Sequence, residues 1–392
     1  MAKIIHMFSS MDDDMREFNE KIWKHRTALA VRFCILLALV VGGIFGIRYY
    51  INNRSFTGYS VSSVTERTDA MNTKYEFFGG KILKYSRDGI SYTDEKDTLL
   101  FSITYTMQSP MLALSGKAGA VADKNGSQIY IFDQQKQMGQ ITTLLPIKNI
   151  SVSDQGIVAV LMEDTDSSKL EIYSSEGILL GDGVFSLEDA GYPMDLSISA
   201  DGKKLGVSFV QTEGSVLTGS VAVYNFDNVG ENYIDHLVFA QSYKEYMIPE
   251  VRYFGNNTLV AVGDGILGIY QGSQIPEVVK EITFEEKIKS VFYGENQIAL
   301  VFEGETGSLL RLYDLRGNVQ AEVSFDLNYD KIRITEQSIL VYNASEMGVY
   351  SYNGKECFRY TLEESVLDIF TRKSRNKYLL VYPSETQQIK LQ

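Results

Sequence analysis

The stretch Leu310-Arg311-Leu312-Tyr313-Asp314 is the clearest copy of a short pattern that returns along most of the chain. Each copy is a mostly apolar run that ends on an aromatic residue, as in Leu170-Glu171-Ile172-Tyr173 and Val221-Ala222-Val223-Tyr224. The aromatic positions are 92, 132, 173, 224, 270, 313 and 350, so the steps between them are 40, 41, 51, 46, 43 and 37 residues. Steps of this length are typical of β-propeller blades. The repeat therefore predicts an all-β chain built from four-stranded blades.

The number of blades follows from how the two ends of the repeat region complete each other. The unit around Tyr270 predicts four strands, at residues 251–254, 259–262, 266–270 and 278–284, whereas the last unit supplies only three, near 366–370, 378–382 and 388–391. An extra strand is predicted at Phe56 to Thr65, ahead of the first unit. An open ring would leave backbone groups unpaired at its edges. We therefore expect this strand to complete the last blade and close a ring of eight blades, with seven as the alternative.

An apolar run precedes the repeats. From Ala28 to Ile47 the only charged residue is Arg32, and about twenty residues of helix span the roughly 30 Å of a bilayer's hydrocarbon core. The run is followed by Arg48-Tyr49-Tyr50 and not by a small-residue cleavage pattern. This favours an uncleaved signal anchor over a cleaved signal peptide. The single-pass anchor would occupy residues 28–50, which are the predicted contact with the cell membrane.

Basic residues near the apolar run predict its orientation. Four precede or begin it and two follow it within about fifteen residues, and the side with more positive charge faces the cytoplasm. These residues are Lys21, Lys24, Arg26 and Arg32, then Arg48 and Arg54. The chain is thus expected to have a cytoplasmic arm at 1–27, a transmembrane segment at 28–50 and an extracytoplasmic propeller at 56–392.

Composition excludes several functions. Among 392 residues, 37 are basic and 50 are acidic, and this acidity disfavours nucleic acid as a partner. His236 is the only histidine among the repeats, so neither a multi-histidine metal site nor a histidine-dependent catalytic group is expected, and no cofactor is predicted. Residues 263–268 have the letters of a dinucleotide-binding fingerprint, but they continue into a predicted strand and not into a helix.

Acidic residues cluster in the predicted connections between second and third strands of blades three, four and six. In a propeller with four-stranded blades, those connections lie on the same face as the loops that link successive blades. We therefore predict an acidic face that binds a basic protein or cell-envelope partner, with a solvated rim as the alternative. The candidate residues are Glu163, Asp164, Asp166, Glu213, Glu303 and Glu305.

The strand ending in Leu312-Tyr313-Asp314 resembles the third strand of a WD40-like repeat in which tyrosine replaces tryptophan. Blade count is similar to that of the quinoprotein propellers, although the tryptophans of those repeats are missing here. As a whole, the short arm, the anchor and the propeller resemble a family of unknown function, composed of membrane-anchored propeller proteins of Gram-positive anaerobes. That resemblance implies the architecture and a membrane location but no activity.

The sequence therefore favours a non-enzymatic role. We expect a protein-interaction or ligand-binding scaffold at the cell surface, because a rigid propeller presents large faces and no catalytic motif accompanies it. The alternative is a cell-envelope hydrolase that uses carboxylates at the centre of the ring, since such chemistry requires no histidine.

Overall fold

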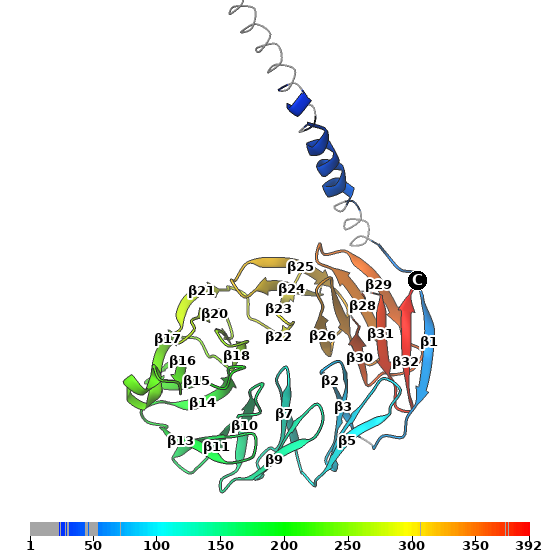
Figure 1. Ribbon diagram of the computed structural model, residues 1–392. Coiled ribbons are helices and arrows are strands. Elements are labelled where there is room, and N and C mark those ends of the chain that lie inside the picture. Colours follow the sequence, from blue (N-terminus) through cyan, green and yellow to red (C-terminus); the bar gives the residue numbers. More distant parts are fainter. Residues whose placement is uncertain are drawn as a thin grey trace, which may run out of the picture. The chain divides into compact units, whose positions relative to one another are not determined.

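The computed structural model describes residues 23, 25–27, 29, 31–43 and 46, then residues 54–70, 72–305, 307–372, 374 and 376–392. Residues 56–392 form one compact unit, separate from the chain up to residue 55. This unit is a ring of eight four-stranded antiparallel sheets arranged around a central channel (Figure 1). The prediction of an all-β, eight-bladed propeller is confirmed, and the seven-bladed alternative is wrong.

Blades one to four follow one another along the chain. Blade one comprises β2 (Lys74–Phe78), β3 (Lys81–Tyr85), β4 (Gly89–Thr93) and β5 (Leu99–Thr104). Blade two comprises β6 (Pro110–Leu114), β7 (Ala118–Asp123), β8 (Gln128–Asp133) and β9 (Gln137–Thr142). Blade three comprises β10 (Ile147–Val152), β11 (Val158–Glu163), β12 (Ser167–Tyr173) and β13 (Leu179–Ser186). Blade four comprises β14 (Tyr192–Ile198), β15 (Lys204–Glu213), β16 (Val216–Asn225) and β17 (Leu237–Lys244), with 3₁₀ turns η1 (Gly230–Asn232) and η2 (Ile234–His236) before β17.

Blades five to eight complete the ring. Blade five comprises β18 (Glu250–Phe254), β19 (Thr258–Val262), β20 (Ile266–Gln271) and β21 (Glu277–Thr283). Blade six comprises β22 (Ser290–Tyr293), β23 (Gln297–Gly304), β24 (Gly307–Asp314) and β25 (Val319–Phe325). Blade seven comprises β26 (Lys331–Ile334), β27 (Ser338–Tyr342), β28 (Glu346–Ser351) and β29 (Glu356–Thr361). Blade eight comprises β30 (Asp368–Thr371), β31 (Lys377–Val381), β32 (Glu385–Leu391) and β1 (Tyr59–Glu66).

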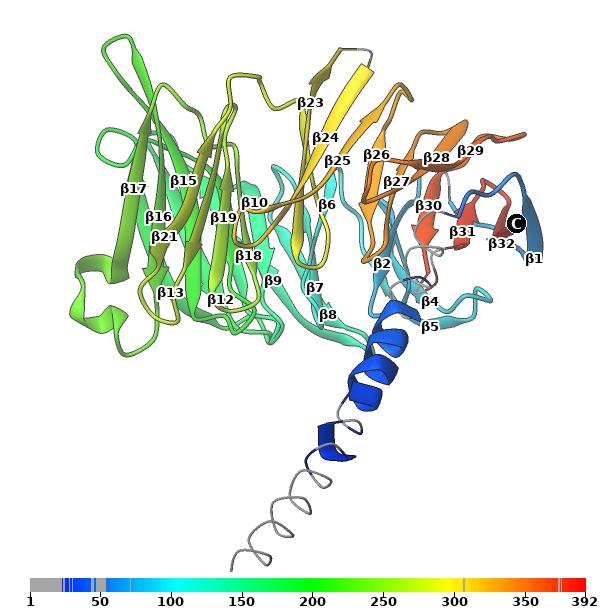
Figure 2. The same ribbon diagram turned by 90° about the horizontal axis from the view of Figure 1, so that it is seen from above.

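Each blade begins with its inner strand and ends with its outer strand. Seen from the side, the strands run roughly along the ring axis, so the connecting hairpins gather on two faces (Figure 2). The connections between second and third strands share one face with the loops between blades. Residues 263–265 lie in the hairpin between β19 and β20, so the dinucleotide-like letters of this segment form a turn between strands.

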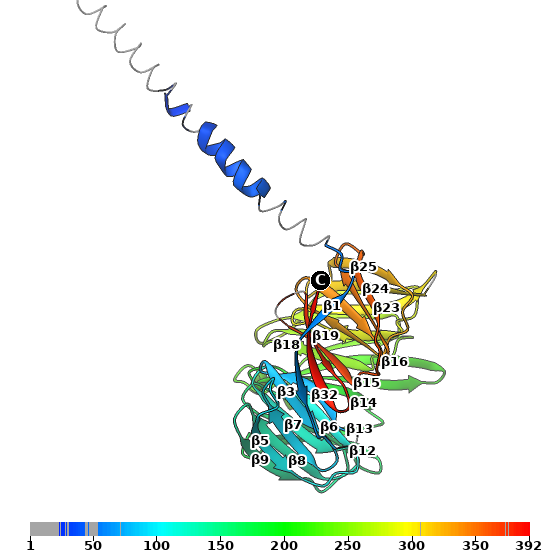
Figure 3. The ribbon, with the colours of Figure 1, turned by 90° about the vertical axis from the view of Figure 1, so that its right-hand side faces the viewer.

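The ring closes through the strand that the sequence predicted for this role. β1 pairs antiparallel with β32, with Tyr59 opposite Leu391 and Glu66 opposite Glu385 (Figure 3). Just beyond β1, the buried Arg67 donates from Nη2 to the carbonyl oxygen of Tyr382 at 2.5 Å. The Phe56 N–H also bonds to the carbonyl of Cys357 at 2.7 Å. The first segment of the ring is therefore tied to its last two blades.

The repeated aromatic residue has the same structural position in every complete unit. It lies on the third strand, and in blades two to seven it directly follows a one-residue bulge in the pairing with the outer strand, as at Tyr173 and Tyr313. Six of the seven aromatic side chains are buried and Tyr224 is half-buried. In two blades the residue two positions before the tyrosine is a glycine, which leaves space for the tyrosine side chain. A Cβ at Gly268 would lie within 3.0 Å of Tyr270, and one at Gly348 would lie within 3.0 Å of Tyr350. The aromatic side chain and the bulge thus form one unit of each blade.

One N-terminal helix, His25–Gly43, is long and apolar enough to cross a membrane. Both a membrane anchor and a signal sequence meet this test. Most of the predicted cytoplasmic arm, and Arg48-Tyr49-Tyr50 after the apolar run, lie outside the described residues.

Candidate functional site

The inner strands surround a channel with a volume of about 840 Å³. Its wall combines apolar residues with charged side chains from several blades, among them Glu76, Asp195, Glu250, Arg252 and Arg333. These residues come from first strands because only those strands face the ring centre. The channel is therefore the hollow of the propeller in which binding or catalysis by central residues would take place.

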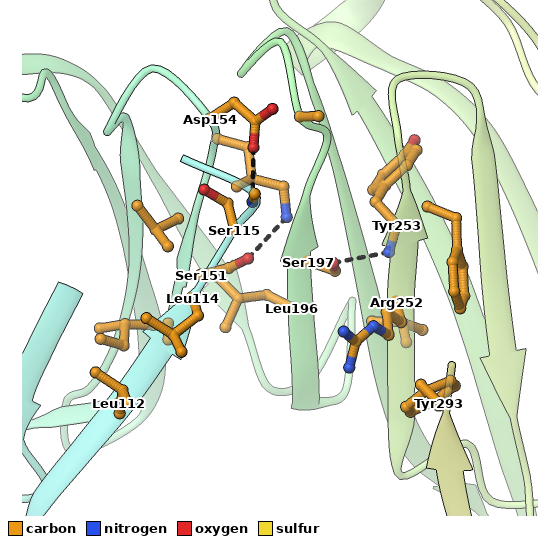
Figure 4. Close-up of a pocket in the computed structure, with 18 of the residues that line it drawn as sticks. Leu112, Leu114, Ser115, Ser151, Asp154, Leu196, Ser197, Arg252, Tyr253 and Tyr293 are labelled. Atoms are coloured by element: carbon orange, nitrogen blue, oxygen red, sulfur yellow. Dashed lines mark hydrogen bonds between the residues drawn. The ribbon is translucent and has the colours of Figure 1, made fainter. Parts of the chain in front are cut away.

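Inner strands of blades three, four and five are joined through side chains. The Ser151 hydroxyl accepts a hydrogen bond from the Ile198 N–H at 3.0 Å, and the Ser197 hydroxyl accepts one from the Tyr253 N–H at 2.9 Å (Figure 4). The inner edge of a blade has backbone N–H groups that its own sheet leaves unpaired. A serine of the preceding blade satisfies them here, so these polar residues support the fold and are not free to react.

Asp195 occupies the centre of this network. One of its carboxylate oxygens accepts the Val251 N–H at 2.9 Å and the other accepts the Asn149 side-chain amide at 2.7 Å. Burial raises the pKa of Asp195 to about 6, although these donors and the Arg252 guanidinium oppose the effect. The carboxylate thus links three blades and titrates above the usual range for aspartate.

The buried carboxylate of Asp368 joins blades seven and eight. Asp368 accepts hydrogen bonds from Arg333 at 2.9 Å, from Lys331 at 2.5 Å and from the Tyr342 hydroxyl at 2.5 Å. Burial alone would raise the pKa of Asp368, but Arg333 and Lys331 hold it below its usual value. Arg333 also lies over the ring of Phe370 at 4.4 Å. This carboxylate is therefore the acceptor of an ion-pair cluster between blades.

Four other acids line the channel, namely Glu76, Asp154, Glu250 and Glu295. Burial raises the pKa of Glu76, and the cations Arg333 and Lys331 counter it only in part. Burial likewise raises the pKa of Glu250, opposed by Tyr293 and Arg252. The Arg252 guanidinium is exposed in the channel and lies 4.6 Å from the Tyr293 ring centre. If the central channel were catalytic, Glu76 and Glu250 would be the carboxyl groups whose raised pKa values suit proton transfer.

The acidic residues predicted from the sequence lie at hairpins of three blades. Glu163 pairs with Lys148, and Glu303 pairs with Lys289, so these two charges are compensated locally. Asp164, Asp166 and Glu305 are exposed, and none of the three forms a salt bridge with any described residue. Glu213 ends β15, and its side chain lies outside what the structure describes.

The hairpin positions divide the predicted acids into separate groups. Glu163, Asp164 and Asp166 share the β11–β12 hairpin, whereas Glu303 and Glu305 share the β23–β24 hairpin, with blades four and five between them. The structure therefore gives two acidic hairpins on one face and not one continuous cluster.

The sequence analysis did not identify the central network, although a signal was present. Asn149-Ile150-Ser151-Val152 and Asp195-Leu196-Ser197-Ile198 share a polar, apolar, serine, apolar order, and both segments are inner strands. Polar residues at the first and third positions of this pattern, repeated in the inner strands of two successive blades, would have indicated side chains that connect neighbouring blades.

The fold defines the protein as an eight-bladed β-propeller in which side chains connect the inner strands of blades three to five and of blades seven and eight. The chain belongs to a family of unknown function, DUF5711, whose pattern matches residues 52–391. No curated protein matches the sequence.

Solved structures share the fold at low sequence identity. BamB from Moraxella catarrhalis matches with a TM-score of 0.50 and 9% identity, covering 85% of this chain and 100% of that one. Apo AztD from Citrobacter koseri matches with a TM-score of 0.52 and 11% identity, covering 80% and 95%. A eukaryotic initiation factor matches with a TM-score of 0.52 and 11% identity, covering 83% of each chain. At these identities the likeness shows the propeller fold and carries no activity.

Proposed function

We propose that this protein is a membrane-anchored propeller, exposed outside the cell membrane, that serves as a binding scaffold for a basic protein or cell-envelope partner. The observation that carries the proposal is that two carboxylates on inner strands accept hydrogen bonds from neighbouring blades. Asp195 and Asp368 are held by donors from neighbouring blades, so they fix the blades and are not available as nucleophiles or bases. A rigid ring of this kind supports binding on its faces.

The proposed contact surface is the face with the two acidic hairpins. Asp164, Asp166 and Glu305 have no local cation among the described residues, so a basic partner would supply the missing charge. These side chains are exposed on hairpins of a rigid scaffold, where binding residues tend to occur. Location outside the membrane follows from the predicted orientation of the N-terminal helix.

The experiment compares capture by two neutralised forms of the full-length protein. In the first, Glu163, Asp164, Asp166, Glu303 and Glu305 become glutamine or asparagine. In the control, three exposed acids on the opposite face, Glu176, Glu231 and Glu336, are neutralised in the same way. We expect capture of envelope proteins from membrane extracts to weaken with salt, to fall at least about tenfold in the first variant and to remain in the control. Equal capture by both variants would show that the acidic hairpins are a solvated rim.

A hydrolase remains the second candidate because Glu76 and Glu250 line the channel with raised pKa values. A survey of cell-envelope glycans and peptides as substrates tests it. Turnover that disappears in both Glu76→Gln and Glu250→Gln, while the melting temperature stays constant, would establish catalysis and contradict a purely binding role.

A further inference from the structure

The outer strand of blade three, β13, has an exposed apolar edge that the fold itself does not use. It exposes Leu179, Leu180 and Val184 to 49, 57 and 64% of their surfaces, and Ile178 just before it to 59%. No other outer strand exposes more than two large apolar side chains, counting all eight as the structure describes them. Exposed edges with apolar side chains are the sites at which sheets pair with a further strand.

Two glycines in β13 have no role within the blade. Gly181 and Gly183 lie outside the left-handed region, and a Cβ on either would meet no atom within 4 Å. Glycine weakens a strand because it has no side chain to pack and gains freedom when unfolded. No turn or close contact within the blade requires these two glycines. They would have a role if another chain approached β13 here, because the missing side chains leave room for those of the other chain.

The charge at the centre of the strand indicates the chemistry of that chain. Asp182 lies between the glycines, is exposed, and is directly opposite Glu171 in the register of β12 and β13. Like charges at directly opposite positions destabilise a sheet. Lys169 pairs with Glu171 at 2.7 Å and also acts on Asp182, so a single lysine is shared between two carboxylates. Glu188 and Asp189 follow β13 and are also exposed.

We propose that the edge of β13 binds an extended peptide segment of a partner protein by adding it as a fifth strand to blade three. The segment is apolar at alternate positions and has a lysine or arginine beside Asp182. Main-chain hydrogen bonds to the free edge provide affinity, and the basic residue selects the register. A second copy of this chain lacks the required cation: antiparallel pairing of two β13 strands about Asp182 would place the two carboxylates opposite each other, and pairing about the strand centre would place each Asp182 opposite Gly183.

This site goes beyond the proposed function, because it involves the outer edge of one blade and neither the channel nor the acidic hairpins. The test uses the full-length protein in lipid nanodiscs and labelled synthetic peptides of about nine residues, a length that covers one strand. One peptide alternates valine and threonine around a central lysine. A second has glutamate in place of lysine, and a third repeats the first with alternate amides N-methylated.

We expect fluorescence anisotropy to show the lysine peptide binding at least about tenfold more tightly than the glutamate peptide, a ratio that corresponds to one favourable charge pair. The Asp182→Lys variant should reverse that order, and N-methylation should abolish binding. Lys280→Glu, a charge change on the outer strand β21, should leave all affinities unchanged. Gly181→Val should weaken binding without lowering the melting temperature, so loss of binding is separated from loss of folding.

Three results would overturn the inference. The first is no binding of the lysine peptide to the native protein. The second is an affinity that does not respond to Asp182→Lys, or that responds equally to Lys280→Glu. The third is a dimer that Leu180→Lys converts to monomer, because the edge would then be covered by a second copy. In each case the acidic hairpins keep their own test, since their variants leave β13 unaltered.

Discussion

The Asp195 carboxylate accepts the backbone N–H of Val251 at 2.9 Å, which joins the inner strand of blade four to that of blade five. The same carboxylate receives the Asn149 amide of blade three. One half-buried side chain therefore connects three consecutive blades, and we expect its protonation state to affect the stability of the ring.

The first prediction concerns the pH dependence of this contact. Burial raises the Asp195 pKa to about 6, whereas an unfolded aspartate titrates near about 3.9. The folded state thus binds the proton more tightly, and the stability gained from protonation is present below about pH 4 and lost as pH rises to about 6. We expect Asp195→Asn to gain stability relative to the native protein, by roughly 2–3 kcal/mol between pH 4 and pH 7. Thermal unfolding across this range measures the difference, and a constant gap between the two proteins would contradict it.

Asp368 should show the opposite pH dependence. Arg333 and Lys331 hold its pKa below the usual value, so its contribution is present above the unfolded pKa and is lost as pH falls through the folded pKa. Asp368→Asn removes one partner of a buried charge cluster and should cost about 3–5 kcal/mol at pH 7. The deficit should shrink below pH 4. If denaturant unfolding gives the same deficit at pH 3 and pH 7, the carboxylate does not pair with these cations.

The third prediction tests ring closure. The Arg67 side chain lies 3.3 Å from Asp69, which also contacts Lys84 at 2.7 Å, and Arg67 bonds to the Tyr382 carbonyl of blade eight. Arg67→Ala should destabilise the propeller by about 1–3 kcal/mol, because the Tyr382 carbonyl loses its charged donor while Asp69 keeps Lys84 as a partner. Deletion of residues 55–66 should go further and cause aggregation, since β32 would become an exposed edge. An unchanged melting temperature after the deletion would show that β1 does not close the ring in solution.

Two valine substitutions test the role of the repeated aromatic residue. A Cβ at Gly348 would lie 2.9 Å from the buried Tyr350 ring, whereas one at Gly181 would meet nothing. Gly348→Val should therefore cost about 1–3 kcal/mol through overpacking, and Gly181→Val should cost nothing or stabilise its strand. Equal melting temperatures for the two variants would show that the aromatic ring has no fixed place against the third strand.

Repeat spacing was sufficient to predict the architecture. Aromatic positions such as Tyr313 marked the third strands, and the missing fourth strand of the last unit predicted that Phe56 to Thr65 would close the ring, as β1 does. Both inferences rest on local pattern and on the need to pair every strand.

Contacts between blades were not predictable in the same way. Ser151 bonds to Ile198 and Asn149 to Asp195 across 47 and 46 residues. Their partners are defined only once the blades are placed around the axis. Similarly, the six predicted acids could be assigned to hairpins, but sequence alone could not show that Glu163 and Glu303 are paired with lysines while Asp164 and Asp166 are not.

The measurement that tests the central claim most directly is cysteine labelling of the full-length protein in intact cells. Ser215 is exposed in the β15–β16 hairpin, and native Cys357 is 1% exposed and shielded from reagent. In a Cys34→Ser background, Ser215→Cys should react with a membrane-impermeant maleimide in intact cells, whereas Ser10→Cys should react only after permeabilisation. That result would agree with an anchored propeller outside the membrane. Labelling of Ser10→Cys in intact cells, with Ser215→Cys protected, would contradict the account.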